Sequence, residues 1–151
     1  METIDIYSKG EYPSNALSNF YPHPFSFDGV QCGGMEGFLQ ALKYRNVDRQ
    51  KRVCALSGKE AKKAGKRKFW WKWTGKVFWL GVPYKRRSEE FQTLLRRAYQ
   101  ALYGQNEAFR LALKASEGKI LAHTMGGNDP RKTILTEAEF LSCLNELREG
   151  K

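Results

Sequence analysis

The chain of 151 residues is 41% hydrophobic and 28% charged, which indicates a single soluble globular domain, 1–151, and excludes a disordered chain or an integral membrane protein. The net charge of +10 is unevenly placed, because residues 43–87 hold 16 basic residues against two acidic ones. Such a basic half attracts phosphates on a nucleotide or a polymer, although a merely solubilising surface is the alternative.

Short strands are predicted near the N-terminus. Residues 4–7 alternate in polarity and predict a strand, and residues 17–21 predict a second one. Phe25–Phe27 and Val30–Cys32 flank Asp28-Gly29, the dipeptide that best tolerates the positive φ angles of a type I′ turn. We therefore expect a hairpin over residues 25–32.

Residues 35–46 have a helical pattern. The apolar residues on one side are Met35, Phe38, Leu39 and Leu42. At roughly 100° per residue, Glu36, Gln40 and Lys43 fall within about 60° of one another on the other side. The pattern predicts a helix whose polar face carries all three.

Two further helices are predicted before the middle of the chain. Asp48 is a candidate cap for a helix that ends at Leu56. Ser57 and Glu60 form a capping-box pattern that would start a helix ending near Gly65.

Aromatic and basic residues are interspersed over residues 66–84. All four tryptophans lie at positions 70–79, Phe69 precedes them, and Phe78 and basic residues lie among them. We expect an irregular loop or strand that packs part of this aromatic surface and exposes the rest. The composition also suits single-stranded nucleic acid, whose bases stack on rings while cations follow the phosphates.

Helices dominate the last third of the chain. A strong amphipathic pattern predicts a helix over 89–103, stopped by Gly104 at a C′ position, and Asn106 caps a following helix to about residue 116. A short strand is expected over 119–123 and a turn over 126–130. Thr136 and Glu139 form a second capping-box pattern, which opens the last helix. The fold class is therefore α+β, a helix-rich single domain with a small sheet.

Glu36 and Lys43 are the candidate catalytic residues. Glu36 follows two glycines at a helix start, and desolvation by a ligand would raise its pKa toward neutrality, as a general acid or base requires. Lys43 could neutralise a phosphate or, with its charge suppressed, attack a sugar anomeric carbon. The alternative for both is a solvated side chain on an exposed helix face.

Several residues are candidates for ligand binding. Asn19 and Gln40 carry the donors and acceptors that ribose hydroxyls need. Phe20, Tyr21 and a tryptophan, for which we take Trp79, could stack on a base, although aromatic residues at such spacings are more often core. Lys62 lies in the basic segment, where phosphates would bind, and His123 ends the strand expected over 119–123.

The sequence lacks several motifs that mark common classes of enzyme. It has no Walker loop, no GxGxxG motif, no nucleophile elbow, and no metal-ligand spacing among its three cysteines and two histidines. We therefore expect no metal and no cofactor. The N-terminus lacks the basic and apolar regions of a signal peptide, and we expect a cytoplasmic protein without membrane partners.

The run from Asn15 to Phe25, together with Asp28-Gly29, Glu36, Phe38, Gln40 and Lys43, resembles the signature of the NADAR family, also called YbiA-like. The resemblance continues in order through Trp79, the helix at 94–103 and the closing residues 144–148. It implies a compact α+β domain that handles NAD-derived or ADP-ribose-like ligands. By position, Glu36 corresponds to the signature acid, Lys43 to the signature lysine, and Asn19 and Gln40 to ligand-holding positions.

The resemblance also implies an activity. Family members are associated with hydrolysis of N-glycosidic bonds, either releasing ADP-ribose from guanine in nucleic acid or cleaving ribosylated intermediates of riboflavin synthesis. We therefore expect an N-glycosidase whose ligand is ADP-ribose-like or a ribosyl phosphate, with ADP-ribosylated nucleic acid as one candidate partner. The alternatives are a binder that senses such ligands without turnover, and a general single-stranded nucleic-acid binder.

One segment departs from the family pattern. Many members have an acidic residue followed by Trp-Gly and a Gly-rich loop after the strand near His123, whereas this chain has Ala122 and no tryptophan over 125–136. The loop at Gly126-Gly127-Asn128 is a partial replacement. The departure bears on the choice of substrate and on activity itself.

Overall fold

The computed structural model describes residues 2–150, so the ends of the expected domain, residues 1 and 151, lie outside the described residues. Within this range the chain forms eight helices and three two-stranded sheets. The expected helix-rich α+β fold is confirmed, with three small sheets in place of one.

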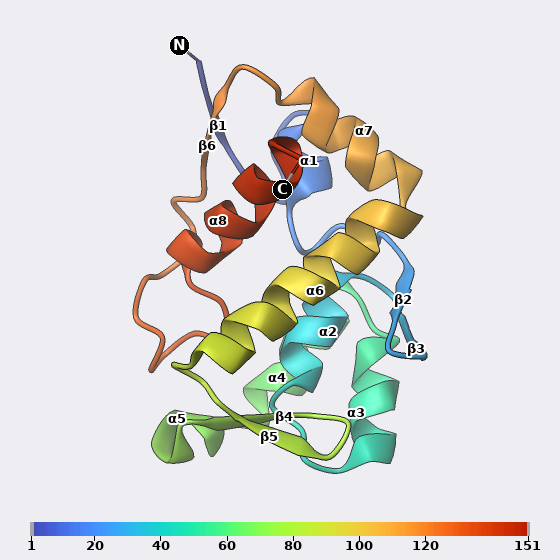
Figure 1. Ribbon diagram of the computed structural model, residues 1–151, viewed down its shortest axis with the longest axis vertical. Helices are drawn as coiled ribbons and strands as arrows, with labels where there is room; N and C mark the ends of the chain where they lie inside the picture. The colour runs from blue at the N-terminus through green and yellow to red at the C-terminus, as the bar shows by residue number, and fades with distance from the viewer. Residues whose placement is uncertain (1, 151) are drawn as a thin grey trace.

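The first and the last strand of the chain pair in one sheet. Strand β1 (Thr3–Asp5) pairs in parallel with β6 (Ile120–Ala122), so the segment after β6 starts beside the N-terminal strand (Figure 1). Helix α1 (Ser14–Leu17) follows β1. The strand expected at 17–21 is wrong, because Ser18 begins a turn in which its carbonyl accepts the Tyr21 amide and its hydroxyl accepts the Phe20 amide.

The predicted hairpin is confirmed. Strands β2 (Phe25–Phe27) and β3 (Val30–Cys32) pair antiparallel across Asp28 and Gly29, which have φ angles of 49° and 80°. Both angles lie in the left-handed region that a type I′ turn requires.

Helix α2 (Met35–Ala41) is shorter than predicted. The fully buried Gln50 side chain donates hydrogen bonds to the carbonyls of Ala41 and Tyr44, at 2.9 and 3.1 Å. The Leu42 carbonyl accepts the Phe78 amide at 2.8 Å. Because these groups occupy carbonyls that further helical turns would use, α2 ends early and Lys43 lies beyond it.

The next two helices form with different caps from those predicted. Helix α3 (Val47–Cys54) is capped by Asn46, whose side chain accepts the Arg49 amide, and not by Asp48. Helix α4 (Gly58–Lys66) follows Ser57, whose side chain makes no capping hydrogen bond, so the expected capping box is absent there.

The aromatic and basic segment contains helix α5 (Trp71–Thr74) and a second hairpin, β4 (Lys76–Trp79) with β5 (Val82–Lys85). Trp71 and Trp79 are buried, whereas three other rings, Phe69, Trp70 and Trp73, are exposed. The expected division of the aromatic surface is confirmed, and the helical turn was not predicted.

The last three helices are α6 (Glu89–Gln105), α7 (Glu107–Ala115) and α8 (Glu137–Arg148). Asn106 caps α7 and the capping box opens α8, both as predicted. The expected stop at Gly104 is wrong, since α6 runs through it and ends where Asn106 caps the next helix.

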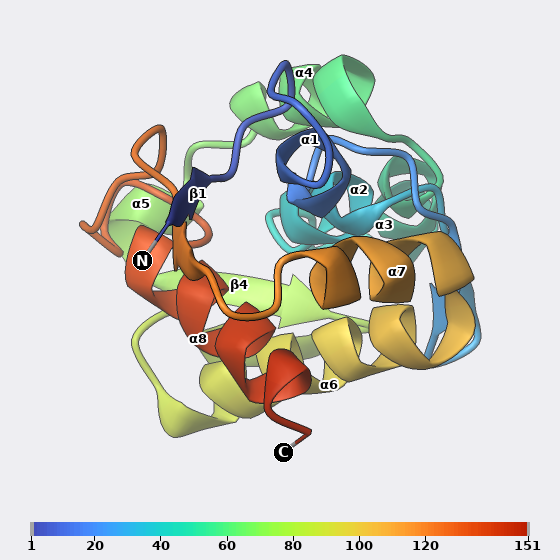
Figure 2. The ribbon, with the colours of Figure 1, turned by 90° about the horizontal axis from the view of Figure 1, so that it is seen from above.

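Helix α2 occupies the middle of the molecule. It packs against α3 and α4 on one side, and α6 crosses its other side (Figures 1 and 2). All seven residues of α2 are buried, Glu36 and Gln40 included. No helix within residues 2–150 is long and apolar enough to cross a membrane.

Candidate functional site

Glu36 lies in the first turn of α2 and is only 9% exposed. Its backbone amide donates to the Asn19 carbonyl at 3.1 Å, and its carboxylate accepts a 2.6 Å hydrogen bond from Nε2 of Gln40. The alternative of a solvated Glu36 on an exposed helix face is therefore wrong, because α4 packs against the helix.

Burial raises the pKa of Glu36 above the usual 4.5 of a glutamate, because the charged form loses its hydration. The hydrogen bond from Gln40 and the positive charges of Lys43, Lys62 and His123 oppose this rise without cancelling it. The site therefore holds a carboxyl whose neutral form is favoured by burial.

Lys43 lies just beyond the end of α2, half-buried, with its Nζ 5.6 Å from the centre of the Trp71 ring. Burial lowers the pKa of its ammonium to about 8, Glu36 opposes this shift, and the like charge of Lys72 adds to it. A lysine with this pKa carries an appreciable neutral fraction near pH 7.

Asn19 is fixed by a residue that sequence reasoning missed. Its side-chain oxygen accepts a 2.7 Å hydrogen bond from the hydroxyl of Tyr99, which is 1% exposed on α6. Tyr99 lies on the apolar face of the predicted helix, where a core role is the natural interpretation. The one available signal is that a buried tyrosine hydroxyl needs a partner.

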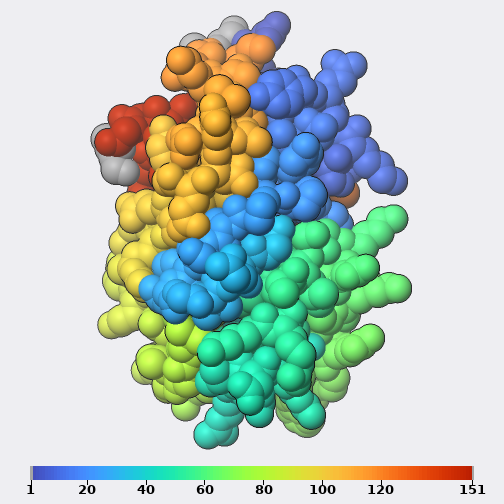
Figure 3. Space-filling view, turned by 90° about the vertical axis from the view of Figure 1, so that its right-hand side faces the viewer, coloured from blue at the N-terminus to red at the C-terminus, as the bar shows by residue number. Residues whose placement is uncertain are grey.

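A cavity of about 250 Å³ opens beside Gln40 and Lys43. Six lysines line it: Lys43, Lys62, Lys66, Lys68, Lys72 and Lys132. No acidic side chain of the described chain is among its lining residues. On the face shown in Figure 3, long side chains of the green segment that holds α4 project into solvent. The cavity is thus a concentrated positive site.

Gln40 separates Glu36 from this cavity. Its Nε2 is bonded to Glu36, whereas its Oε1 is buried and has no hydrogen-bond partner within residues 2–150. The amide packs directly against Gly65, where a β-carbon would overlap it. A buried amide oxygen without a donor is a costly arrangement that a ligand hydroxyl could relieve.

Of the next three ligand-binding candidates, two lie close to Glu36 and one lies away from the cavity. Lys62 Nζ lies 5.7 Å from the Phe20 ring, which places both close to Glu36. Tyr21 is 40% exposed and packs on His23 at 4.4 Å, away from the cavity lining. These residues surround the start of α2 without forming a single stacking platform.

Trp79 and His123 have structural partners. Trp79 is buried against Phe27 and Phe38, and its Nε1 donates to Asp28 at 2.9 Å, so it does not line the cavity. His123 lies just after β6, with Nδ1 2.9 Å from the Ile6 carbonyl, and its charge acts on Glu36. The fold brings His123 toward the site and keeps Trp79 in the core.

The family model described as bacteriophage protein GP30.3 matches residues 11–149. The chain belongs to this GP30.3 family. It is 47% identical over 151 residues, 99% of each chain, to the uncharacterized 17.1 kDa protein of the Gp30-rIII intergenic region of Enterobacteria phage T4. The fold is similar to the NMR structure of the E. coli protein YbiA, with a TM-score of 0.65 and 19% identity over 99% of this chain and 84% of that one.

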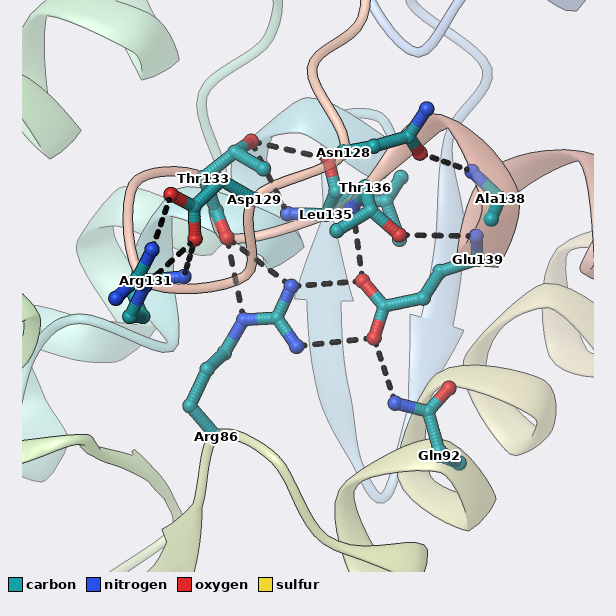
Figure 4. A network of polar contacts seen from close by, with 10 residues as sticks. All are labelled: Arg86, Gln92, Asn128, Asp129, Arg131, Thr133, Leu135, Thr136, Ala138 and Glu139. Carbon is teal, nitrogen blue, oxygen red and sulfur yellow. Dashed lines mark hydrogen bonds and ion pairs between the residues drawn. The ribbon is translucent and has the colours of Figure 1, made fainter.

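In this GP30.3-family chain the segment after His123 is held by a buried ion pair that sequence reasoning also missed. Arg86 makes two hydrogen bonds to the Glu139 carboxylate, at 2.7 and 2.9 Å, and two more to the Thr133 carbonyl (Figure 4). Asn128 accepts the Ala138 amide at 3.1 Å. Lys132 and Thr133, both from this loop, line the cavity. The pair thus positions one wall of the site.

Proposed function

We propose that this chain is an N-glycosidase that cleaves the bond between a nitrogen base and C1 of an ADP-ribosyl or ribosyl-phosphate conjugate. The observation that carries the proposal is the pairing of one buried carboxyl, Glu36, with a cavity lined by six lysines. The YbiA-like fold and the NADAR-like signature residues agree with it.

The size and charge of the cavity favour a phosphate-bearing fragment. At about 250 Å³ it lies below the roughly 300–1,000 Å³ of typical ligand pockets, so it would hold a ribosyl-phosphate portion and leave the rest of a larger ligand outside. Lys62 and Lys132 approach from α4 and from the loop before α8, two directions from which a phosphate can be neutralised.

The chemistry would take place at the ribose C1. Rotation of the Gln40 side chain would give Glu36 access to the cavity and let a ribose hydroxyl donate to Oε1, which lacks a donor within residues 2–150. The ionised carboxylate would then stabilise the oxocarbenium-like transition state and activate the attacking water. The neutral fraction of Lys43 provides a second route, attack on C1 with the base as leaving group.

A second candidate function is binding without turnover. Ala122, half-buried at the end of β6, stands where many NADAR-like sequences have an acid. A site with only one carboxyl could hold an ADP-ribose-like ligand and leave it intact.

Incubation with guanine-ADP-ribosylated DNA, followed by mass spectrometry of released ADP-ribose, tests the proposal. We expect release by the wild type and a decrease of about 100-fold or more in Glu36→Gln, the order that general acid–base catalysis contributes. Glu60→Gln, at an exposed glutamate in the first turn of α4, is the matched control and should keep full activity.

Ribosylated intermediates of riboflavin synthesis form the second substrate arm of the same assay. Release that is unchanged in Glu36→Gln would remove Glu36 from the mechanism. Calorimetric binding of ADP-ribose without any release from either substrate would support the binder instead.

A further inference from the structure

The segment around α5 is the most one-sidedly charged part of the chain. Residues 61–88 contain ten basic residues and no acidic one. Only some of this charge serves the fold: Arg86 is buried in the ion pair with Glu139, whereas Lys72, Lys76 and Lys85 are exposed. Their mutual repulsion would be relieved by an anionic partner.

Three exposed rings form a cluster on this segment. Phe69 stacks on Trp70 with ring centres 5.4 Å apart, and Trp73 meets both rings edge-on, at 5.7 and 5.1 Å. Their exposed fractions are 46%, 59% and 72%. Such a large apolar cluster in water marks a surface that binds something.

A groove of about 470 Å³ runs beside this aromatic cluster. Trp73 lines it together with six cationic residues: Lys72, Lys76, Lys85, Arg86, Arg87 and Arg131. Lys72 also lines the cavity beside Gln40, and Phe69 lines that cavity too. The aromatic cluster therefore lies between two positively charged sites, the groove and the cavity beside Gln40.

The backbone under the groove is well supported. The Gly75 amide donates to the Trp71 carbonyl at 2.8 Å, and the Gly75 carbonyl accepts the Arg86 amide, also at 2.8 Å. These bonds tie α5 to the end of the β4–β5 hairpin. The rings and cations are thus presented by a surface that is already formed.

We propose that this groove and its aromatic cluster bind single-stranded nucleic acid. Unpaired bases would stack on Trp70 and Trp73, while Lys72, Lys76 and Lys85 contact the phosphates. A duplex fits this surface less well, because its bases are already stacked inside the helix. A flat anionic membrane could not place its phosphates along a concave groove.

This binding does not depend on turnover at Glu36. Lys76, Lys85 and Arg87 line the groove and not the cavity, and Glu36 does not line the groove. The proposed glycosidase could therefore fail while strand binding holds, or the reverse, and the two are measured separately.

Fluorescence anisotropy of a labelled oligothymidylate of about 12 nucleotides tests the proposal, since single-strand sites span roughly 4–16 nucleotides. We expect the double variant Trp70→Ala/Trp73→Ala to weaken binding at least tenfold, because the bases can no longer stack on these two rings. Leu111→Ala, an exposed apolar residue on α7, is the matched control and should bind as the wild type does.

The charge contribution is tested by salt. Lys72→Gln/Lys76→Gln should reduce the slope of log affinity against log salt by about 0.7 for each phosphate that the variant no longer neutralises, the value for single strands. Lys114→Gln, exposed on α7, should leave the slope unchanged. Circular dichroism of every variant verifies that the fold is kept.

Three results would overturn the proposal. One is equal affinity of the wild type and Trp70→Ala/Trp73→Ala for the oligothymidylate. Another is equal or tighter binding of a duplex of the same length. The third is a blue shift of tryptophan emission with phosphatidylcholine–phosphatidylglycerol vesicles and none with the oligonucleotide, which would assign the aromatic cluster to a membrane surface. Glu36→Gln should bind the strand as tightly as the wild type.

Discussion

The hydroxyl of Tyr99 on α6 reaches the Asn19 side chain at 2.7 Å, and the carbonyl of the same asparagine accepts the Glu36 amide at 3.1 Å. A buried residue of one helix is thereby linked, through a loop residue, to the first turn of another. Because Asn19 is held at both its side chain and its backbone, the position of Glu36 depends on α6.

Tyr99→Phe removes this link while keeping the ring in the core. We expect a decrease of about 1 kcal/mol in the free energy of unfolding, because the Asn19 oxygen loses its donor. Urea denaturation measures the decrease, and weaker ADP-ribose binding should accompany it. Tyr103→Phe, on the same helix, is the control and should change neither quantity. Equal stability of Tyr99→Phe and the wild type would contradict the role of the link.

Glu36→Gln should stabilise the protein increasingly as pH rises. The pKa of Glu36 is raised on folding, so its favourable contribution is complete below the unfolded value of 4.5 and is lost as pH rises through the folded value. Glutamine does not ionise and has no such penalty, so the difference in Tm between variant and wild type should grow as pH rises above about 4.5. Glu60→Gln, at an exposed side chain of α4, is the matched control. If the difference in Tm did not change with pH, the ionisation of Glu36 would cost no folding stability.

Lys43 should titrate well below an ordinary lysine. Its pKa is lowered to about 8, so about a tenth of it is neutral at pH 7, against a few in ten thousand at the usual 10.5. Reductive methylation with ¹³C formaldehyde gives an NMR signal for each lysine, and the signal that is missing in Lys43→Arg belongs to Lys43. In Glu36→Gln the titration midpoint of Lys43 should fall further, because the Glu36 carboxylate opposes the lowering of the Lys43 pKa. A midpoint near 10.5 would exclude the nucleophile route.

Local patterns predicted the elements whose signals are themselves local. Asp28-Gly29 indicated the hairpin because two adjacent residues set the turn, and Thr136 with Glu139 indicated the start of α8 for the same reason. The early end of α2 could not be predicted in this way. It depends on Gln50, whose hydrogen bonds to Ala41 and Tyr44 come from a neighbouring helix.

The same division holds for the site. Periodicity placed Glu36 and Gln40 on one face of α2, which is correct, but it could not show that α4 covers that face. Tyr99 and Arg86 were missed because their partners, Asn19 and Glu139, lie 80 and 53 positions away in the sequence. Contacts of this range depend on the packing of helices, which no window of sequence contains.

Gly65→Ala tests whether the position of the Gln40 amide matters. A β-carbon at Gly65 would overlap that amide, so the substitution should displace it and break its 2.6 Å hydrogen bond to Glu36. We expect a decrease in stability and in ligand binding, although alanine is favoured over glycine in helices by about 1 kcal/mol. Gly104→Ala in α6 is the matched control, since a β-carbon there meets nothing within 4 Å, and it should raise Tm. Stabilisation by both substitutions would mean that Gln40 relocates freely.

The ion pair of Arg86 with Glu139 should hold the loop that forms one wall of the cavity. The side chains are 3% and 12% exposed, so Arg86→Met leaves a carboxylate buried with fewer donors and should cost about 3–5 kcal/mol. Arg131→Gln, which removes an exposed pair with Asp129, is the control and should change stability little. Arg86→Met/Glu139→Leu removes both charges and should recover much of that stability. Because the Thr133 carbonyl still lacks its two donors, hydrogen exchange over 128–136 should remain faster than in the wild type. If hydrogen exchange over 128–136 were as slow in this double variant as in the wild type, the loop would hold its position without Arg86.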